Sequence, residues 1–275
     1  MDAKNMPSAS VSFSGNIPHH YDQYQGPIFF EPYALEIARR IDPSHVQVAL
    51  EIACGTGRVT RHLRTAIPPS SKLIASDISP DMLAVAREKL KTLNIDWRII
   101  DAQELPFDDN SIDLVVCCFG YMFVPDKRKA FAEVYRVLKS DGVFLFSTWD
   151  KLELNAASYV HRKTVKKYLE NSLPATFLLA FSMNDDSIIK EDLEQAGFPN
   201  IKIEKVDKVA VSPTAKEAAY GLVQGGSIYN ELMNRNPVWI DEIKTIVEKE
   251  LAKKFGASPM AAPMRAVIIE AKKMN

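Results

Sequence analysis

The chain has 275 residues, and 34 Lys and Arg against 35 Asp and Glu leave a formal net charge of −1. This length predicts one large domain or one domain with a substantial insertion, and 47% hydrophobic residues are enough to form a full core. The near-zero charge argues against a protein whose affinity rests on neutralising many phosphates, so we expect no nucleic-acid partner.

Three features of the sequence bear on the compartment in which the protein works. The opening residues carry no apolar stretch that could serve as a signal peptide. The longest uncharged runs, such as 114–124, are far shorter than the roughly 20 residues that span a bilayer. The cysteines, Cys54, Cys117 and Cys118, are too few and too badly spaced for a disulfide framework. We therefore expect a cytoplasmic protein with no membrane partner.

Residues 1–44 are unusually aromatic for an unstructured tail. They contain Tyr21, Tyr24, Phe29, Phe30 and Tyr33. Because burial of aromatic side chains away from water lowers the free energy, we expect this segment to fold back as a cover over the rest of the chain.

Residues 45–149 alternate between β-rich runs and amphipathic helices. The predicted strands are 45–52, 72–77, 96–100, 112–119 and 142–149. Ser79 is expected to cap a helix that begins with Pro80 and buries Met82, Val85, Ala86 and Leu90. A further helix begins after Asp126 and is expected to end at 141–142. Strand–helix units with short links predict an α/β fold with a parallel, doubly wound sheet.

The pattern changes after residue 150. Helices are predicted over 154–171 and 187–196, and strands over 201–211 and 265–271. The first of these strands places Ile201, Ile203, Val209 and Val211 on one face, with a break in register near Val206. The roughly forty helical residues between the two strands are too long for a hairpin loop, so they must pack elsewhere. We therefore divide the chain into a cover (1–44), a ligand-binding core (45–150) and the rest of the sheet with helical inserts (151–275, inserts about 151–186 and 212–257).

The most informative segment is LEIACGTGR (50–58), in which a buried strand enters a glycine turn and then a helix. Gly55 and Gly57 allow a sharp turn and a close approach to a ligand. The helix that follows presents free N–H groups to a negatively charged group. This pattern alone fits many nucleoside or dinucleotide binders.

Three acidic residues at the ends of successive strands narrow the interpretation. Glu51 lies inside the end of the first strand, where a carboxylate is costly without a partner. Asp77 ends the second strand and Asp101 follows the third, at the edge where open α/β sheets bind ligands. We expect an ammonium group near Glu51, a ribose diol at Asp77 and an exocyclic amine near Asp101. The alternative for the two aspartates is turn chemistry, because Asp favours Asx turns.

These motifs resemble those of class I S-adenosylmethionine-dependent methyltransferases. EIACGTG (51–57) matches the first family motif, with Ala53 at its first glycine position. DISPDML (77–83), DAQELPF (101–107) and RVLKSDG (136–142) resemble the motifs that follow, in order and at the family spacing. The core is similar to the quinone-biosynthesis C-methyltransferases, although many enzymes that act on unrelated substrates share these motifs.

The resemblance implies a Rossmann-like sheet of seven strands whose last strand is antiparallel, and a cofactor that lies across the strand ends. It implies that S-adenosylmethionine is converted to S-adenosylhomocysteine. Glu51 would hold the methionine ammonium and Asp77 the ribose. The expected cofactor-binding residues are Tyr21, Glu51, Ala53, Gly55, Gly57, Asp77, Ile78, Met82, Asp101, Ala102 and Phe119. Tyr21 and Tyr121 are among the aromatic residues that could face the sulfonium.

The expected reaction is in-line transfer of a methyl group to a small, moderately hydrophobic organic acceptor. No cluster has metal-ligand spacing, so we expect no metal, and no residue stands out as a general base. We expect the N-terminal cover and the two inserts to form a helical lid that excludes water; deleting residues 1–35 should then weaken cofactor binding and abolish turnover. Two alternatives stay open: a catalytically silent relative and an NAD(P)-dependent oxidoreductase, although Thr60 stands where a dinucleotide motif has its third glycine.

Overall fold

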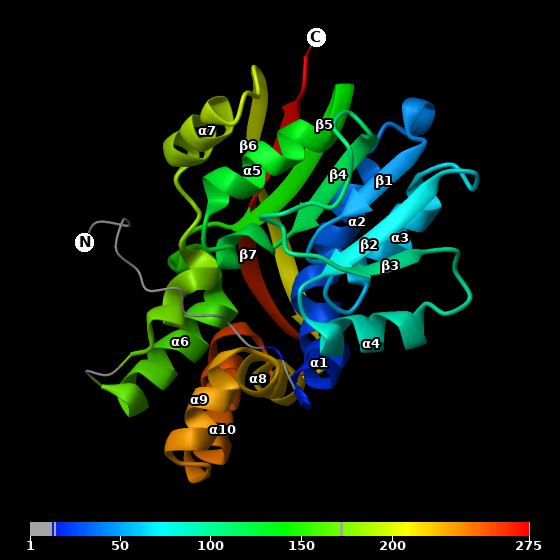
Figure 1. The fold of residues 1–275 in the computed structure, drawn as a ribbon. Coiled ribbons are helices and arrows are strands. Elements are labelled where there is room, and N and C mark those ends of the chain that lie inside the picture. The colour runs from blue at the N-terminus through cyan, green and yellow to red at the C-terminus, as the bar shows by residue number, and fades with distance from the viewer. Residues whose placement is uncertain (1–12, 14, 171–172, 275) are drawn as a thin grey trace.

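The computed structural model describes residues 13, 15–170 and 173–274, which form a seven-stranded sheet in the order β3-β2-β1-β4-β5-β7-β6 (Figure 1). The strands are β1 (Val48–Glu51), β2 (Lys72–Asp77), β3 (Asp96–Ile99), β4 (Ile112–Cys118), β5 (Leu138–Trp149), β6 (Asn200–Ser212) and β7 (Met260–Lys272). The first five are parallel, and β7 runs antiparallel to both β5 and β6. The predicted Rossmann-like α/β fold with an antiparallel last strand is confirmed.

Helices flank this sheet on both faces. In Figure 1, α5 and α7 lie in front of the sheet and α2 and α3 lie behind it. The helices are α1 (Ile17–His20), the π-helix η2 (Tyr21–Phe30), α2 (Glu31–Arg39), α3 (Arg58–Ala66), α4 (Pro80–Lys89), α5 (Lys127–Val137), α6 (Ala156–Leu169), α7 (Asp186–Gln195), α8 (Ala215–Gln224), α9 (Ile228–Arg235) and α10 (Val238–Phe255). Short 3₁₀ turns are η3 (Pro43–His45), η4 (Tyr121–Phe123), η5 (Leu152–Leu154) and η6 (Ala175–Phe181).

Helix α4 begins as predicted and buries a slightly different stripe. The Ser79 hydroxyl accepts a hydrogen bond from the Met82 N–H at 3.3 Å, and Pro80 is the first helical residue. Leu83 is buried, whereas Val85 is only half-buried because it lines a groove beneath α1. Helix α4 therefore packs against two neighbours, the sheet and the N-terminal segment.

Two predicted boundaries were wrong around β1 and β5. Residues 45–47 precede β1, because Pro43–His45 form a 3₁₀ turn. Helix α5 ends at Val137, and Asp141 and Gly142 lie within β5 instead of ending the helix. Leu138 pairs with Ile112 and Val143 with Leu114, so the residues between them form an irregularity in the strand, where Asp141 has a φ of +63°. A turn-forming dipeptide marks a local bend, which here occurs inside a paired strand.

The predicted break near Val206 is a change of the buried face, and it does not interrupt the pairing of β6. The strand pairs with β7 residue by residue from Asn200 to Ser212. Ile203 is half-buried, but Val209 and Val211 are more than half exposed, while Ala210 between them is buried. The buried face changes along the strand, and the helices α7, η2, α2 and α8 pack against it. The change in the hydrophobic alternation therefore reflects which side of β6 is covered, and the strand itself is continuous.

The N-terminal segment packs over the carboxyl ends of the central strands. The Phe30 ring lies 5.4 Å from that of Phe119, which follows β4, and 5.7 Å from that of Trp149, which ends β5. Helix α8 packs against η2 and α10, and α10 packs against α6 (Figure 1). The expected fold-back is therefore confirmed from residue 15 onward, whereas residues 1–12 and 14 lie outside the described part of the chain. The division into three domains stays a prediction.

Candidate functional site

The loop after β1 holds three residues with left-handed backbone, Ala53, Gly55 and Gly57. A Cβ at Gly57 would lie 2.9 Å from Leu90 Cδ1 and 3.2 Å from the Ala86 Cβ, whereas a Cβ at Gly55 would meet nothing within 4 Å. Gly57 is thus required by packing between α3 and α4, and Gly55 borders open space. Ala53 has a φ of +53°. This conformation costs about 1–2 kcal/mol, because the Cβ lies too close to the carbonyl oxygen that follows it.

Glu51 is a buried carboxylate, and one of its two oxygens lacks a hydrogen-bond partner among the described residues. Glu51 is 1% exposed, and the oxygen concerned is Oε2. Burial raises the pKa of Glu51 to about 8; the Thr60 hydroxyl opposes this rise, and the Asp77 charge adds to it. A nearby cation would stabilise the ionised carboxylate and reverse the pKa shift.

Asp77 joins the end of β2 to the glycine loop. Its Oδ2 accepts a hydrogen bond from the Gly55 N–H at 2.8 Å, and its Oδ1 accepts one from the Ser79 N–H at 2.9 Å. Burial raises the pKa of Asp77, while these backbone donors and the Ile78 N–H oppose the rise. Ile78 itself is 66% exposed. The structure thus brings Asp77, Gly55 and Glu51 together, as the strand-end pattern predicts.

Asp101 lies farther out than predicted. Strand β3 ends at Ile99, and the exposed Asp101 carboxylate accepts hydrogen bonds from the Gln103 N–H at 2.9 Å and the Gln103 Nε2 at 3.1 Å. The turn chemistry considered for this residue is therefore present. Ala102, the next residue, is buried.

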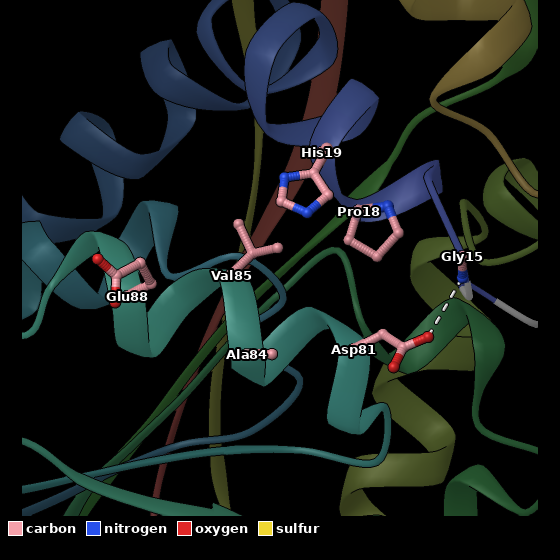
Figure 2. Close-up of a pocket in the computed structure, with 7 residues that line it drawn as sticks. All are labelled: Gly15, Pro18, His19, Asp81, Ala84, Val85 and Glu88. Carbon is pink, nitrogen blue, oxygen red and sulfur yellow. Dashed lines mark hydrogen bonds between the residues drawn. The ribbon is translucent and has the colours of Figure 1, made fainter.

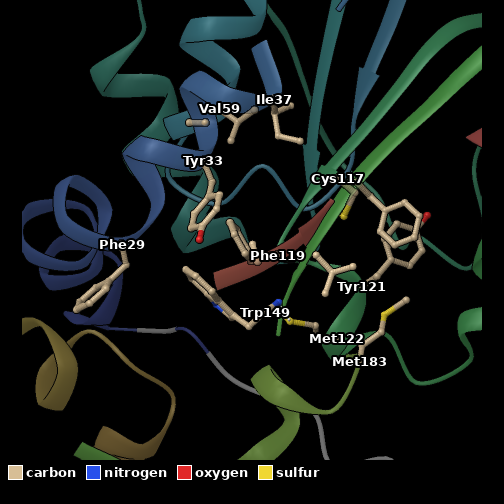
Figure 3. Packing of buried hydrophobic residues seen from close by; sticks show 14 of the residues in the cluster. Phe29, Tyr33, Ile37, Val59, Cys117, Phe119, Tyr121, Met122, Trp149 and Met183 are labelled. Carbon is tan, nitrogen blue, oxygen red and sulfur yellow. Dashed lines mark hydrogen bonds between the residues drawn. The ribbon is translucent and has the colours of Figure 1, made fainter. Parts of the chain in front are cut away.

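An aromatic group lies at the ends of β4 and β5. The Phe119 ring stacks on Trp149 with 4.2 Å between centroids, and Figure 3 shows both rings beside Tyr33. Tyr21 packs its ring 4.9 Å from Phe30. Burial raises the pKa of the Tyr21 phenol, Arg58 lowers it and Asp77 raises it further. Through Phe30, the predicted residues Tyr21 and Phe119 lie together at the carboxyl ends of the strands, the edge that also carries the acids; Met82 is buried in α4.

The expectation that Tyr121 could face a ligand was wrong. Its ring is fully buried, 4.9 Å from Phe131 and 5.5 Å from Phe144, so it is part of the core (Figure 3). Sequence reasoning missed Trp149, although its place at the end of a predicted strand is a signal that could have found it. It also missed Gly120, where a Cβ would lie 2.5 Å from that of Ala53.

The described residues offer little other site chemistry. In this part of the chain no group of three or more His, Cys, Asp or Glu side chains could hold a metal ion. Within the same residues, no helix is long and apolar enough to cross a membrane. A surface pocket of about 370 Å³ lies between α1 and α4, where the Gly15 N–H donates to Asp81 Oδ2 at 3.2 Å (Figure 2).

Comparison with known proteins identifies the family. Residues 50–146 match the model of a methyltransferase domain. A demethylmenaquinone methyltransferase of Staphylococcus haemolyticus is 33% identical over 207 residues, which cover 68% of this chain and 84% of that protein. The ubiquinone/menaquinone biosynthesis C-methyltransferase of Pseudoalteromonas translucida is 34% identical over 163 residues, or 54% of this chain and 65% of that protein. The chain belongs to the class I S-adenosylmethionine-dependent methyltransferases.

The fold of this methyltransferase also agrees with solved structures. A phosphoethanolamine N-methyltransferase of Haemonchus contortus, bound to phosphomonomethylethanolamine and S-adenosylhomocysteine, superposes with a TM-score of 0.60 at 20% identity, over 94% of this chain and 57% of that one. It is the family membership that makes this protein an enzyme that uses S-adenosylmethionine. The comparisons give no support to the oxidoreductase alternative.

Proposed function

We propose that this methyltransferase binds S-adenosylmethionine across the carboxyl ends of β1, β2 and β4 and transfers its methyl group to a small apolar acceptor. The observation that carries the proposed site is the buried Glu51 carboxylate, whose Oε2 has no partner among the described residues, at the end of the strand that leads into the loop where Gly55 borders open space. A cationic amine beside that space would supply the missing partner, and the methionine part of the cofactor has such an amine.

The remaining residues are assigned by their places along this edge. Asp77 is 8% exposed at the end of β2 and can exchange a backbone donor for the ribose hydroxyls. The other proposed contacts are Ala53, Gly55 and Gly57 along the methionine part, Ile78 and Met82 along the adenosine, Asp101 and Ala102 at the adenine, and Tyr21 and Phe119 near the methyl group. The exposure of Ile78 and Asp101 leaves both accessible to an adenine ring.

We propose an acceptor with a flat apolar ring. Phe30, Phe119 and Trp149 present aromatic rings at the ends of β4 and β5, and aromatic pairs favour stacked or edge-on partners. The quinone-related names of the relatives and the near-neutral charge of this chain support the same choice over nucleic acid. The absence of a long apolar helix among the described residues is compatible with the proposed cytoplasmic location.

The mechanism is in-line displacement, in which the cofactor supplies an activated methyl group. The work left to this chain is orientation, exclusion of water and placement of charge. Holding two reactants in line can contribute roughly 7–11 kcal/mol, and an aromatic face near a cation roughly 0.5–2 kcal/mol. Tyr21 and Phe30 from η2 would close the site above the acids, and Glu51 would hold the positive charge of the amine.

The proposal is tested by calorimetric titration with S-adenosylmethionine, S-adenosylhomocysteine and NADH. Wild type should bind the first two and not NADH, and Asp77→Asn should lose most of that affinity. Asp96→Asn is the matched control, because Asp96 pairs with Arg98 at the start of the neighbouring strand, away from the loop. Release of S-adenosylhomocysteine with hydroquinones and phenols, but not with charged amines, would support the acceptor class; binding of NADH alone would refute the cofactor site.

A further inference from the structure

The N-terminal π-helix η2 is fastened to the glycine loop by one carboxylate. Asp22 Oδ1 accepts a hydrogen bond from the Thr56 hydroxyl at 2.7 Å, and Thr56 lies between Gly55 and Gly57. The same oxygen contacts Arg58 Nη2 at 3.2 Å, at the first residue of α3, and the Lys89 ammonium at the last residue of α4. One side chain of the cover therefore bonds to three elements that surround the proposed cofactor site.

The Asp22 carboxylate lies between two cationic side chains, Arg58 and Lys89, and offsets their charge. The side chains of Asp22, Arg58 and Lys89 are 20%, 13% and 27% exposed, so solvent screens their interaction only in part. Arg58 also donates to the Asp22 carbonyl at 2.8 Å and to Glu31 Oε2 at 3.2 Å. Arg58 thus holds both ends of η2, and loss of the Asp22 charge would leave Arg58 and Lys89 facing each other with like charge.

The fastening has a direct consequence for the site, because Tyr21 precedes Asp22. The Tyr21 ring packs 4.9 Å from Phe30, and Phe30 lies 5.4 Å from Phe119 at the end of β4. On its other side, η2 contacts the helical insert, where Gln25 Nε2 donates to the Gly221 carbonyl of α8 at 2.8 Å. A shift of η2 would therefore move Tyr21 and Phe30 away from Phe119 and loosen the insert.

We infer that Asp22 is a positioning residue for the cofactor: it fastens η2 to Thr56, Arg58 and Lys89 and so holds Tyr21 and Phe30 beside the ends of β4 and β5. This inference rests on the proposed cofactor site and adds the residue that holds its cover closed. Loss of these bonds would free η2 and leave the proposed cofactor site less completely covered.

The test measures S-adenosylhomocysteine affinity by calorimetry in wild type and Asp22→Asn, at low salt and at about 1 M salt. If the unfastened cover is closed only a tenth of the time, the apparent Kd rises about tenfold. At about 1 M salt the Debye length is about 3 Å, but partly buried pairs are screened less than exposed ones, so wild-type affinity should fall only part of the way toward that of the variant, and the variant should lose less affinity than wild type. Asp22→Glu keeps the carboxylate and should stay within about threefold of wild type.

Glu36→Gln is the matched control. Glu36 lies in α2 of the same N-terminal segment and pairs with Arg40 and Lys208, but it makes no bond to the glycine loop. It should retain wild-type affinity and salt dependence, while thermal unfolding reports any general loss of stability in each variant. Deleting residues 1–35 is less discriminating, because it would also remove the fully buried Tyr33. If Asp22→Asn does not fold, Lys89→Met removes one bond and should weaken binding about threefold.

The outcomes separate this inference from the function on which it rests. Wild type that binds no S-adenosylhomocysteine would overturn both. Wild type that binds, with Asp22→Asn within about twofold of it at low salt, would overturn the positioning role alone. Equal weakening in Glu36→Gln would do the same, because the effect would then belong to the whole segment.

Discussion

Gly55 and Gly57 are two residues apart in the same loop, yet the structure predicts opposite consequences for their substitution by alanine. Both have positive φ, so alanine costs about 1–2 kcal/mol at either position. At Gly57 the new methyl group would also press on Leu90 and Ala86 in α4, and overpacking adds about 1–3 kcal/mol. Gly57→Ala should therefore lose about 2–5 kcal/mol of stability, and Gly55→Ala about 1–2 kcal/mol.

Binding should show the reverse order. The Cβ added at Gly55 would point into the open space that we assign to the cofactor, so Gly55→Ala should weaken S-adenosylhomocysteine binding about tenfold or more, equivalent to ~1.4 kcal/mol. Gly57→Ala, measured well below its unfolding transition, should bind with a smaller loss. Urea denaturation gives the free energies of unfolding, and calorimetry gives the affinities. Equal destabilisation in both variants, or unchanged affinity in Gly55→Ala, would refute the reasoning; Ala53 shows that the loop holds an alanine at positive φ.

Two further predictions concern buried polar groups. The pKa of Glu51 is about 8 when folded and near 4.3 when unfolded, so the folded protein binds this proton more tightly and loses stability as pH rises from about 5 to about 8. The loss should be about 1.4 kcal/mol of unfolding free energy per pH unit in wild type and should be absent in Glu51→Gln. The variant should also bind S-adenosylhomocysteine more weakly above pH 8. If urea denaturation gave the same pH dependence of stability for wild type and variant, the prediction would be wrong. The Tyr121 hydroxyl is buried without a partner among the described residues, so Tyr121→Phe should be about 1 kcal/mol more stable than wild type and equally active, as thermal unfolding and turnover can check.

The repeated core of this methyltransferase could be predicted from the sequence because its signals are local. Ser79 and Pro80 begin α4 as expected, and Asp126 caps α5 by accepting from the Lys129 N–H at 3.0 Å. Hydrophobic runs separated by short links are sufficient to place the five parallel strands. The acids at the ends of those strands then had to lie at one edge, since parallel strands share a direction.

Features that depend on which element covers another could not be predicted in this way. Val209 and Val211 alternate correctly for a strand, but the face that is buried depends on where η2, α2 and α8 lie. Phe119 and Tyr121 are neighbours in an apolar run, and only the turn at positive φ after β4 sends one toward the site and the other into the core. The hydrophobic periodicity indicates that a side chain is buried, but it does not indicate which element of the structure covers that side chain.

The sequence by itself determined the parallel core, the glycine loop, the strand-end acids and the cofactor class, because each depends on residues close together in the chain. The tertiary structure alone decided that Asp22 meets Thr56, which is 34 residues away, and Lys89, which is 67 residues away. It also decided that Glu51 Oε2 has no partner within the described part of the chain, because that depends on every neighbour that could have approached it. Contacts of this kind arise from the packing of whole elements, and no local pattern of residues encodes them.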